Sequence, residues 1–288
     1  MKKTGIKEWL SILRSTTKRW WDKDPFRQSA VIAYYAIFSI PVMLVIAIDL
    51  GGIAFGQTEV RNEISAAITD SFGHDTAVEI QNMLIKSIQH KSTIVAEIIG
   101  VITLIFGATG VFLELQISLN SIWDAHPPVK QGFGYFIKNR LLSFGLIVSI
   151  GFLLAISLII TSLLTIFSGW ISQQFSIIAV YLLHVINFSF SLFAISFLFA
   201  CMFKVLPDTK VNWKHMWPGA ILTALLFVLG KYALGYYFVR FQPASIYGTA
   251  GSIVLLLLWV SYSCIIVLFG AEFTRHYSYY KDSGEFLA

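Results

Sequence analysis

Long apolar runs separated by shorter polar connections make up most of this chain. A helix needs about 20 residues to cross the hydrocarbon core of a bilayer, and each run is about that long or longer. The runs are residues 29–50, 93–119, 141–167, 175–203, a fifth that begins at Pro218, and 248–272. The pattern predicts an all-α fold, a polytopic membrane bundle of about six transmembrane helices.

The second run, 93–119, differs from the others because it carries two carboxylates, Glu97 and Glu114. Gly100, Gly107 and Gly110 lie between them, along one side of a helix. Small residues let helix backbones approach closely in lipid, and acids inside a spanning helix usually face protein or a wet cavity. We therefore expect this helix in the middle of the bundle, with its acids turned inward.

The segment before the first run is basic and aromatic. Ile6, Trp9, Leu10 and Leu13 fall at helical spacing with lysine and arginine around them, a pattern typical of an amphipathic helix lying in the membrane surface. A soluble helix packed on a partner is the alternative. The predicted domains are a cytoplasmic amphipathic segment at 1–28, a membrane domain at 29–273 with an external loop at 51–92, and a cytoplasmic tail at 274–288.

Composition supports the membrane assignment, and the charges indicate the orientation. Of 288 residues, 56% are hydrophobic and only 13% charged, whereas soluble domains carry about 25% charged residues. The net charge of +5 could suggest nucleic-acid binding. However, most Lys and Arg residues lie in the two termini and in the second and fourth connections, as the positive-inside rule requires if both termini are cytoplasmic. The predicted partner is the lipid bilayer. A second copy of the chain or an envelope protein is also considered as a partner, and nucleic acid is not expected to bind.

Polar residues near or within the runs form two groups by predicted depth. The outer group is Asp49, Glu97, His184, Lys231 and Arg240, and the inner group is Glu114, Asn120, Arg140 and Glu272. Lys231 is the costliest, at about 3 kcal/mol if unpaired at the bilayer centre. We expect Lys231 to pair with Glu97, or second with Asp49, and Glu114 and Glu272 to share the inner end with Arg140. These groups either flank a gated polar path or are ion-pair clusters that hold the bundle together.

The fourth run adds a polar stripe, and motifs of enzymes are missing. His184, Asn187 and Ser191 are spaced i, i+3 and i+7, so they share one helix face, where they either line a path or bond neighbouring helices. No HExxH, phosphate loop or G-x-S-x-G motif occurs, and the two cysteines form no CxxC pair. From the sequence we therefore expect a protein that is not an enzyme and that has no catalytic residue, metal or cofactor.

Several short motifs, spread in order over most of the chain, resemble the YihY/BrkB family of bacterial inner-membrane proteins, formerly grouped under a ribonuclease BN label. The motifs are Ala33-Tyr34-Tyr35 with Phe38-Ser39-Ile40-Pro41, Leu119-Asn120-Ser121-Ile122-Trp123, Leu206-Pro207, Pro218-Gly219-Ala220, Tyr247-Gly248, Leu258-Trp259-Val260-Ser261-Tyr262 and Gly270-Ala271-Glu272. The resemblance implies a six-helix protein with both termini inside. Its members are described as candidate transporters, and some are linked to envelope integrity or virulence.

These observations predict a transporter, or part of one, for an envelope-related solute or lipid in the bacterial cytoplasmic (inner) membrane. A non-transporting structural or partner-binding membrane protein is the alternative. A membrane nuclease ranks third, because the nucleolytic metal ligands that the old family label would require are missing from the sequence.

Overall fold

A computed structural model describes residues 6–56, 94–125, 177–209, 211–241 and 250–283, with isolated positions in 58–69 and 243–247. Within these ranges some side chains fall outside the description, among them those of Asp49, Glu97, His184 and Asn187. The elements in the described ranges are helices, and no strand occurs there.

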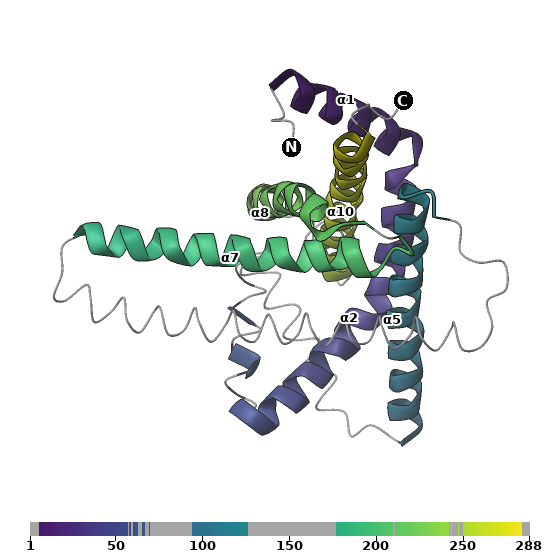
Figure 1. Ribbon diagram of the computed structural model, residues 1–288. Helices are drawn as coiled ribbons and strands as arrows, with labels where there is room; N and C mark the ends of the chain where they lie inside the picture. The colour runs from purple at the N-terminus through teal and green to yellow at the C-terminus, as the bar shows by residue number, and fades with distance from the viewer. Residues whose placement is uncertain are drawn as a thin grey trace. The chain divides into compact units, whose positions relative to one another are not determined.

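The helices are long, as the apolar runs predict (Figure 1). They are α1 (Ile6–Asp22), α2 (Pro25–Phe55), α5 (Ile94–Ile122), α7 (Ile177–Val205), α8 (Trp213–Phe241) and α10 (Gly251–Ser283). Among the described residues, three segments are long and apolar enough to cross a membrane: Phe188–Val205, Trp213–Phe238 and Ile253–Ser283. The predicted third span at 141–167 and most of the loop at 51–92 lie outside the described residues, so the count of six spans stays a prediction.

Several helix ends differ from the prediction: α2 extends beyond the first run, 29–50, at both ends, and α8 and α10 also differ. Helix α8 begins at Trp213 rather than at Pro218, and the backbone N–H of His215 already donates to Asn212 O at 3.0 Å. Pro218 therefore lies inside the helix near its start, where a missing N–H costs less than in the middle. Helix α10 continues past the predicted end of the sixth span to Ser283.

The continuation of α10 makes residues 274–283 of the predicted cytoplasmic tail helical, and the location of this tail stays a prediction. Phe273, Tyr277 and Tyr280 are spaced at i, i+4 and i+7, so they share one face of the helix. Phe273 and Tyr280 are buried in a cluster with Ile12 of α1, and Tyr277 packs against it. Apolar burial on this face explains why a polar-looking segment remains helical.

The chain forms two compact units. The first comprises Met1–Lys23, Gln116–Leu226 and Val267–Ala288, and the second Asp24–Leu115 and Phe227–Ile266. The first unit thus holds α1, the end of α5, α7, the start of α8 and the end of α10. The second holds α2 and the remaining parts of α5, α8 and α10.

In the first unit, α1 packs against the end of α10. The Trp9 ring stacks on Phe273 and Tyr277, each with a centroid separation of 5.7 Å, and Ile12 is fully buried. The predicted N-terminal helix is therefore present with one face on its own chain. That its other face lies in the membrane surface stays a prediction.

Helices α8 and α10 meet in the first unit through two matching motifs, Gly219 with Thr223 and Gly270 with Thr274. A Cβ atom on Gly219 would collide with the Thr274 side chain, and one on Gly270 would collide with the Thr223 side chain. Each threonine hydroxyl donates to the carbonyl of the glycine one turn earlier in its own helix, at 2.7 Å. The contact is thus close, reciprocal and free of unsatisfied hydroxyl groups.

In the second unit, α5 packs closely on α2. A Cβ atom on Gly107 would lie 2.9 Å from Ser39 N, and one on Gly110 would collide with the Tyr35 ring. Ala33 and Ala36 of α2 are buried with Val260 of α10 in the adjacent core. The prediction that glycines of the second run allow close helix packing is confirmed at Gly107 and Gly110.

Candidate functional site

A buried carboxylate lies at the centre of the polar network in the first unit. The Glu272 side chain on α10 has no exposed surface, and its Oε1 atom lies 3.1 Å from Arg19 Nε and 3.3 Å from His276 Nε2. Neither Glu272 oxygen has a hydrogen-bond partner of good geometry among the described residues. Charged groups in helices of this apolar class are expensive and mark functional positions, so Glu272 is the first candidate site residue.

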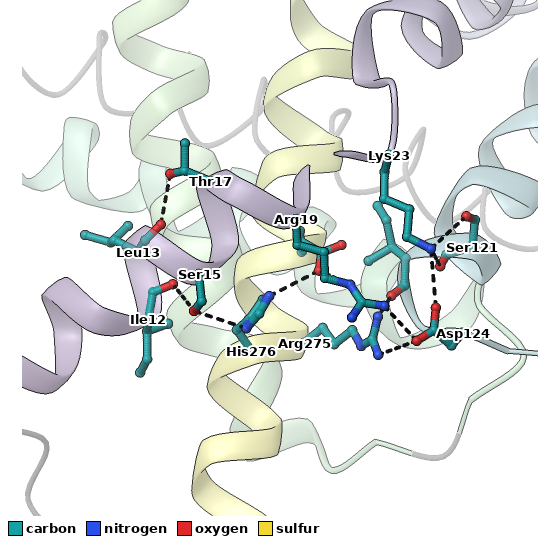
Figure 2. A network of polar contacts seen from close by, with 12 residues as sticks. Ile12, Leu13, Ser15, Thr17, Arg19, Lys23, Ser121, Asp124, Arg275 and His276 are labelled. Atoms are coloured by element: carbon teal, nitrogen blue, oxygen red, sulfur yellow. Dashed lines mark hydrogen bonds and ion pairs between the residues drawn. The ribbon is translucent and has the colours of Figure 1, made fainter. Parts of the chain in front are cut away.

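His276 connects Glu272 to α1. The ring is 2% exposed, and its Nδ1 atom lies 3.3 Å from the Ser15 hydroxyl oxygen (Figure 2). The same hydroxyl lies 3.0 Å from Ile12 O and 3.1 Å from Ser11 O. One imidazole therefore joins a buried acid on its own helix to a serine of the N-terminal helix.

Asp124, just beyond the end of α5, forms ion pairs with three cationic side chains (Figure 2). Its Oδ2 atom lies 2.7 Å from Arg19 Nη2 and 2.6 Å from Arg275 Nη2, and its Oδ1 atom lies 3.3 Å from Lys23 Nζ. Arg19 therefore bridges Asp124 and Glu272. Burial alone would raise the pKa of Asp124, but hydrogen bonds from Arg275 and Arg19 and their positive charges lower it to about 2.

The same cations cap the end of α5. Lys23 Nζ donates to Ser121 O at 2.9 Å, and Arg275 donates to Ile122 O. The last carbonyls of a helix lack partners within it and carry a partial negative charge. The last turn of α5 contains no basic residue of its own, so the cations come from Lys23, just after α1, and from Arg275 of α10.

Acid is expected to weaken this cluster. Because the pKa of Asp124 falls from 3.8 to about 2 in the folded protein, its stabilising effect is present above about pH 4 and is lost as pH falls toward 2. Asp124 is 46% exposed, so solvent screening limits the effect to below about 1 kcal/mol. The midpoint of thermal unfolding, followed between about pH 5 and pH 2.5 in detergent, should fall less steeply in Asp124→Asn than in the wild type. Asp282→Asn, at an exposed carboxylate outside the cluster, serves as the control; equal slopes for all three proteins would refute the prediction.

Asn120 fastens the α7–α8 connection to the end of α5. Its Nδ2 atom donates to Asp208 Oδ2 at 3.0 Å, and its Oδ1 atom accepts from the backbone N–H of Asp208 at 2.8 Å. The Asn120 side chain is 8% exposed. Sequence analysis selected Asn120 for its depth; the structure gives it a reciprocal pair with the connection that follows α7.

We expect Asn120→Asp to destabilise the protein by about 1–3 kcal/mol. The new carboxylate cannot donate to Asp208 Oδ2, and it places a second negative charge beside the Asp208 carboxylate. Adding Asp208→Asn should restore most of the loss, since the new amide donates to the new carboxylate. Chemical denaturation in detergent measures both changes. Asp208→Asn alone is the matched control, and a double variant no more stable than Asn120→Asp would show that the pair does not hold the connection.

A second polar group in the first unit contains Ser278, His215 and Asp282. The Ser278 Oγ atom lies 3.3 Å from His215 Nδ1, and Asp282 Oδ1 lies 3.6 Å from the same nitrogen. In a catalytic triad the serine and the acid use opposite ring nitrogens. This arrangement is therefore not that of a serine hydrolase. Among the described residues, no three His, Cys, Asp or Glu side chains are placed together to hold a metal ion.

The other predicted site residues lie elsewhere on the helices or outside the described residues. Glu114 is half-buried on α5 and Lys231 half-buried on α8, both in the ranges described, and Arg240 is exposed near the end of α8. Asp49, Glu97, His184 and Asn187 lie on α2, α5 and α7 with side chains outside the description, and Arg140 lies outside the described residues altogether. The Lys231–Glu97 pair and the polar stripe of the fourth run thus stay predictions.

Sequence reasoning missed five members of the cluster. It placed Glu272 with Arg140 and Glu114, whereas the described partners of Glu272 are Arg19 and His276. The missed residues are Arg19, Lys23, Asp124, Arg275 and His276. The one available signal was spacing: Lys23 follows Arg19 by four residues, just after the end of α1, and Glu272 and His276 share a face of α10.

Four of the short motifs meet in the first unit. Asn120 of the Leu119–Trp123 motif bonds Asp208, which follows Leu206-Pro207. Gly219 of the Pro218–Ala220 motif lies against Gly270, which begins the motif that ends in Glu272. The motifs therefore mark one connected region that contains the charged cluster.

Long apolar helices that carry a buried ionic network define an all-helical membrane protein. The family described as Virulence factor BrkB matches residues 16–286, and the chain belongs to this family, as the sequence motifs indicated. A UPF0761 membrane protein of Pseudoalteromonas atlantica is 27% identical over 85% of this chain and 78% of its own length. Another from Tolumonas auensis is 26% identical over 88% and 81%, and one from Histophilus somni is 28% identical over 74% and 72%. No solved structure matches the chain.

Proposed function

We propose that this protein is a transporter, or part of one, for an envelope-related lipid or solute, and not an enzyme. We place it in the bacterial cytoplasmic membrane with both termini cytoplasmic. The observation that carries the proposal is Glu272, a fully buried carboxylate within the apolar segment Ile253–Ser283. An ionisable group at such a position is costly, and proteins retain such groups mainly on substrate and ion pathways.

The cations around Asp124 favour a cargo with an anionic headgroup. Arg19 and Arg275 present guanidinium groups to one half-exposed carboxylate, with Lys23 beside them. Guanidinium groups suit carboxylate and phosphate oxygens alike, and an exposed ion pair is worth only about 1 kcal/mol or less. A phosphate-bearing lipid could therefore compete with Asp124 at little cost, which makes a phospholipid the cargo to test first.

Proteoliposomes that contain a fluorescent phosphatidylglycerol in both leaflets would test this proposal. Dithionite bleaches only the outer leaflet, so transport appears as bleaching beyond the protected half. We expect wild-type protein to exceed protein-free vesicles, and Glu272→Gln to lose the excess. Asp282→Asn, which changes an exposed carboxylate near the end of α10, should transport like the wild type. Bleaching that stops at one half with folded wild-type protein would count against lipid transport.

A non-transporting structural or partner-binding role is the second candidate, including a homo-oligomer or an envelope protein as partner. It is favoured by the way Asp124 ties residues of α1 and α10 to the end of α5, because ion pairs often fix geometry rather than chemistry. In that case Glu272→Gln should alter the stability of the protein while no lipid movement depends on it. Nucleic-acid binding is not part of either proposal, since the placement of Lys and Arg along the chain is that expected from the positive-inside rule.

A further inference from the structure

Glu272 and His276 lie one turn apart on α10, where their side chains meet in a dry environment. Glu272 Oε1 and His276 Nε2 are 3.3 Å apart, and the two side chains are 0% and 2% exposed. Neither atom has a hydrogen-bond partner of good geometry among the described residues. The carboxylate and the ring nitrogen therefore face each other at ion-pair distance, with Arg19 Nε as the other charged group close to the carboxylate.

The hydroxyl of Ser15 decides which ring nitrogen carries a hydrogen. A serine hydroxyl has one hydrogen to donate, and Ser15 Oγ lies 3.0–3.1 Å from two carbonyls of its own helix but 3.3 Å from His276 Nδ1. Donation to a carbonyl three or four residues earlier is the usual choice of a serine within a helix. The Ser15 oxygen then accepts from His276 Nδ1–H, which leaves Nε2 of a neutral ring without a hydrogen.

A bare Nε2 facing an ionised carboxylate would place two acceptors against each other. One additional proton resolves the conflict, either on Nε2, giving an imidazolium and a carboxylate, or on Glu272, giving a carboxylic acid that donates to the ring. Imidazole is the side chain suited to exchanging such a proton at physiological pH. The pair therefore has a place for one proton beyond those of a neutral histidine and an ionised glutamate.

The Glu272–His276 pair has the cation Arg19 on one side, and Asp124 is the carboxylate that Arg19 contacts on the other. Arg19 of α1 contacts Glu272 directly. Asp124, just beyond the end of α5, contacts Lys23 and also Arg275 of α10. Farther along α10, Glu8 of α1 hydrogen-bonds Tyr280, and His215 of α8 faces Asp282. Because Arg19 touches both carboxylates, a proton on the pair weakens its attraction to Glu272 and leaves Asp124 as its stronger partner.

We propose that Glu272 and His276 form a proton-binding site, and that its occupancy determines whether Arg19 stays bound to Glu272. The proton comes from water, binds at the Nε2–Oε1 contact and returns to water, with no other bond made or broken. That this proton is the coupling ion of transport rests on the proposed function, whereas the proton site itself does not.

Nuclear magnetic resonance of protein with ¹⁵N-labelled histidine, in lipid nanodiscs, tests the site directly. The signals of His276 are those lost in His276→Gln. We expect a doubly protonated ring at low pH that loses its second proton as pH rises. At a fixed pH, Glu272→Gln should change how hydrogen is distributed between the two ring nitrogens, because the carboxylate that faces Nε2 is gone. In Asp282→Asn the His276 signals should not move. A His276 ring that keeps hydrogen on Nε2 alone at every pH, or whose signals are the same in Glu272→Gln as in the wild type, would overturn the site.

The coupling is tested in the same vesicles as lipid transport. An imposed proton gradient should change the rate of bleaching by wild-type protein several-fold, and His276→Gln should respond to the gradient no more than protein-free vesicles do. Transport that ignores the gradient in wild-type protein would overturn the coupling. Absence of any transport would instead refute the proposed function, and the histidine signals would still decide whether the proton site exists.

Discussion

Replacing Arg19 by alanine is expected to lower the free energy of unfolding by about 3–5 kcal/mol, the range found when a buried charge loses its partner. Arg19 Nε lies 3.1 Å from the Glu272 carboxylate, which has no exposed surface. Without the guanidinium, Glu272 retains only His276 within ion-pair distance in the described structure. It must then remain charged at high cost or take up a proton, and either outcome destabilises the folded protein.

Two comparisons separate this effect from simple loss of a side chain. Lys23→Ala removes a cation that contacts the half-exposed Asp124 and the Ser121 carbonyl, and should cost about 1–2 kcal/mol, less than Arg19→Ala. The double variant Arg19→Ala with Glu272→Ala should be less destabilised than the sum of its single variants, since it leaves no stranded carboxylate. Chemical denaturation in detergent gives all four values. If the two losses simply add, the buried pair contributes nothing specific.

Gly270→Ala is expected to destabilise the first unit by about 1–3 kcal/mol, the usual cost of forcing an extra methyl group into a packed contact. The added Cβ atom would meet Thr223 Oγ1, with Thr223 Cβ at 2.9 Å. Helix α8 would have to move away from α10, because the obstructing atoms include Cβ, which cannot rotate aside. Gly219→Ala should act similarly through Thr274.

A size exchange tests whether the collision is the cause. In Gly270→Ala with Thr223→Gly the small residue moves to the opposite helix, so the double variant should regain stability relative to Gly270→Ala, apart from about 1 kcal/mol for the new helix glycine. Leu229→Ala, at a side chain of α8 that is 65% exposed, is the control and should have little effect. Thermal unfolding in detergent measures the series, and wild-type stability in Gly270→Ala would contradict the close contact.

Hydropathy predicted helix positions well wherever an apolar run alone defines the helix. The runs 93–119 and 175–203 correspond to α5, Ile94–Ile122, and α7, Ile177–Val205. It failed at the end of α10, because Thr274, Arg275 and His276 lower the local hydropathy. Those polar groups are tolerated there because Ser15, Asp124 and the α5 carbonyls satisfy Arg275 and His276 from other parts of the chain.

Two buried members of the candidate site, Glu272 and Asn120, were predictable, but buried His276 and the partners of Glu272 and Asn120 were not. Glu272 and Asn120 were recognisable because polar residues at the ends of apolar runs need a reason to be there. Their partners are distant in sequence, Arg19 for Glu272 and Asp208 for Asn120, and no local periodicity connects them. Arg19 in particular was ascribed to membrane orientation, which explains the sign of its charge but not the carboxylates that it bridges.

The paired glycine and threonine motifs of α8 and α10 also have a consequence for temperature. Glycine has no side chain to order and threonine is already restricted about χ1, so this contact forms with little loss of side-chain entropy. Its attraction is van der Waals packing, which in lipid replaces the hydrophobic drive between helices. Hydrophobic association weakens on cooling, whereas close packing of this kind does not depend on the ordering of water. The two helices are therefore joined by a contact suited to keeping its strength in the cold.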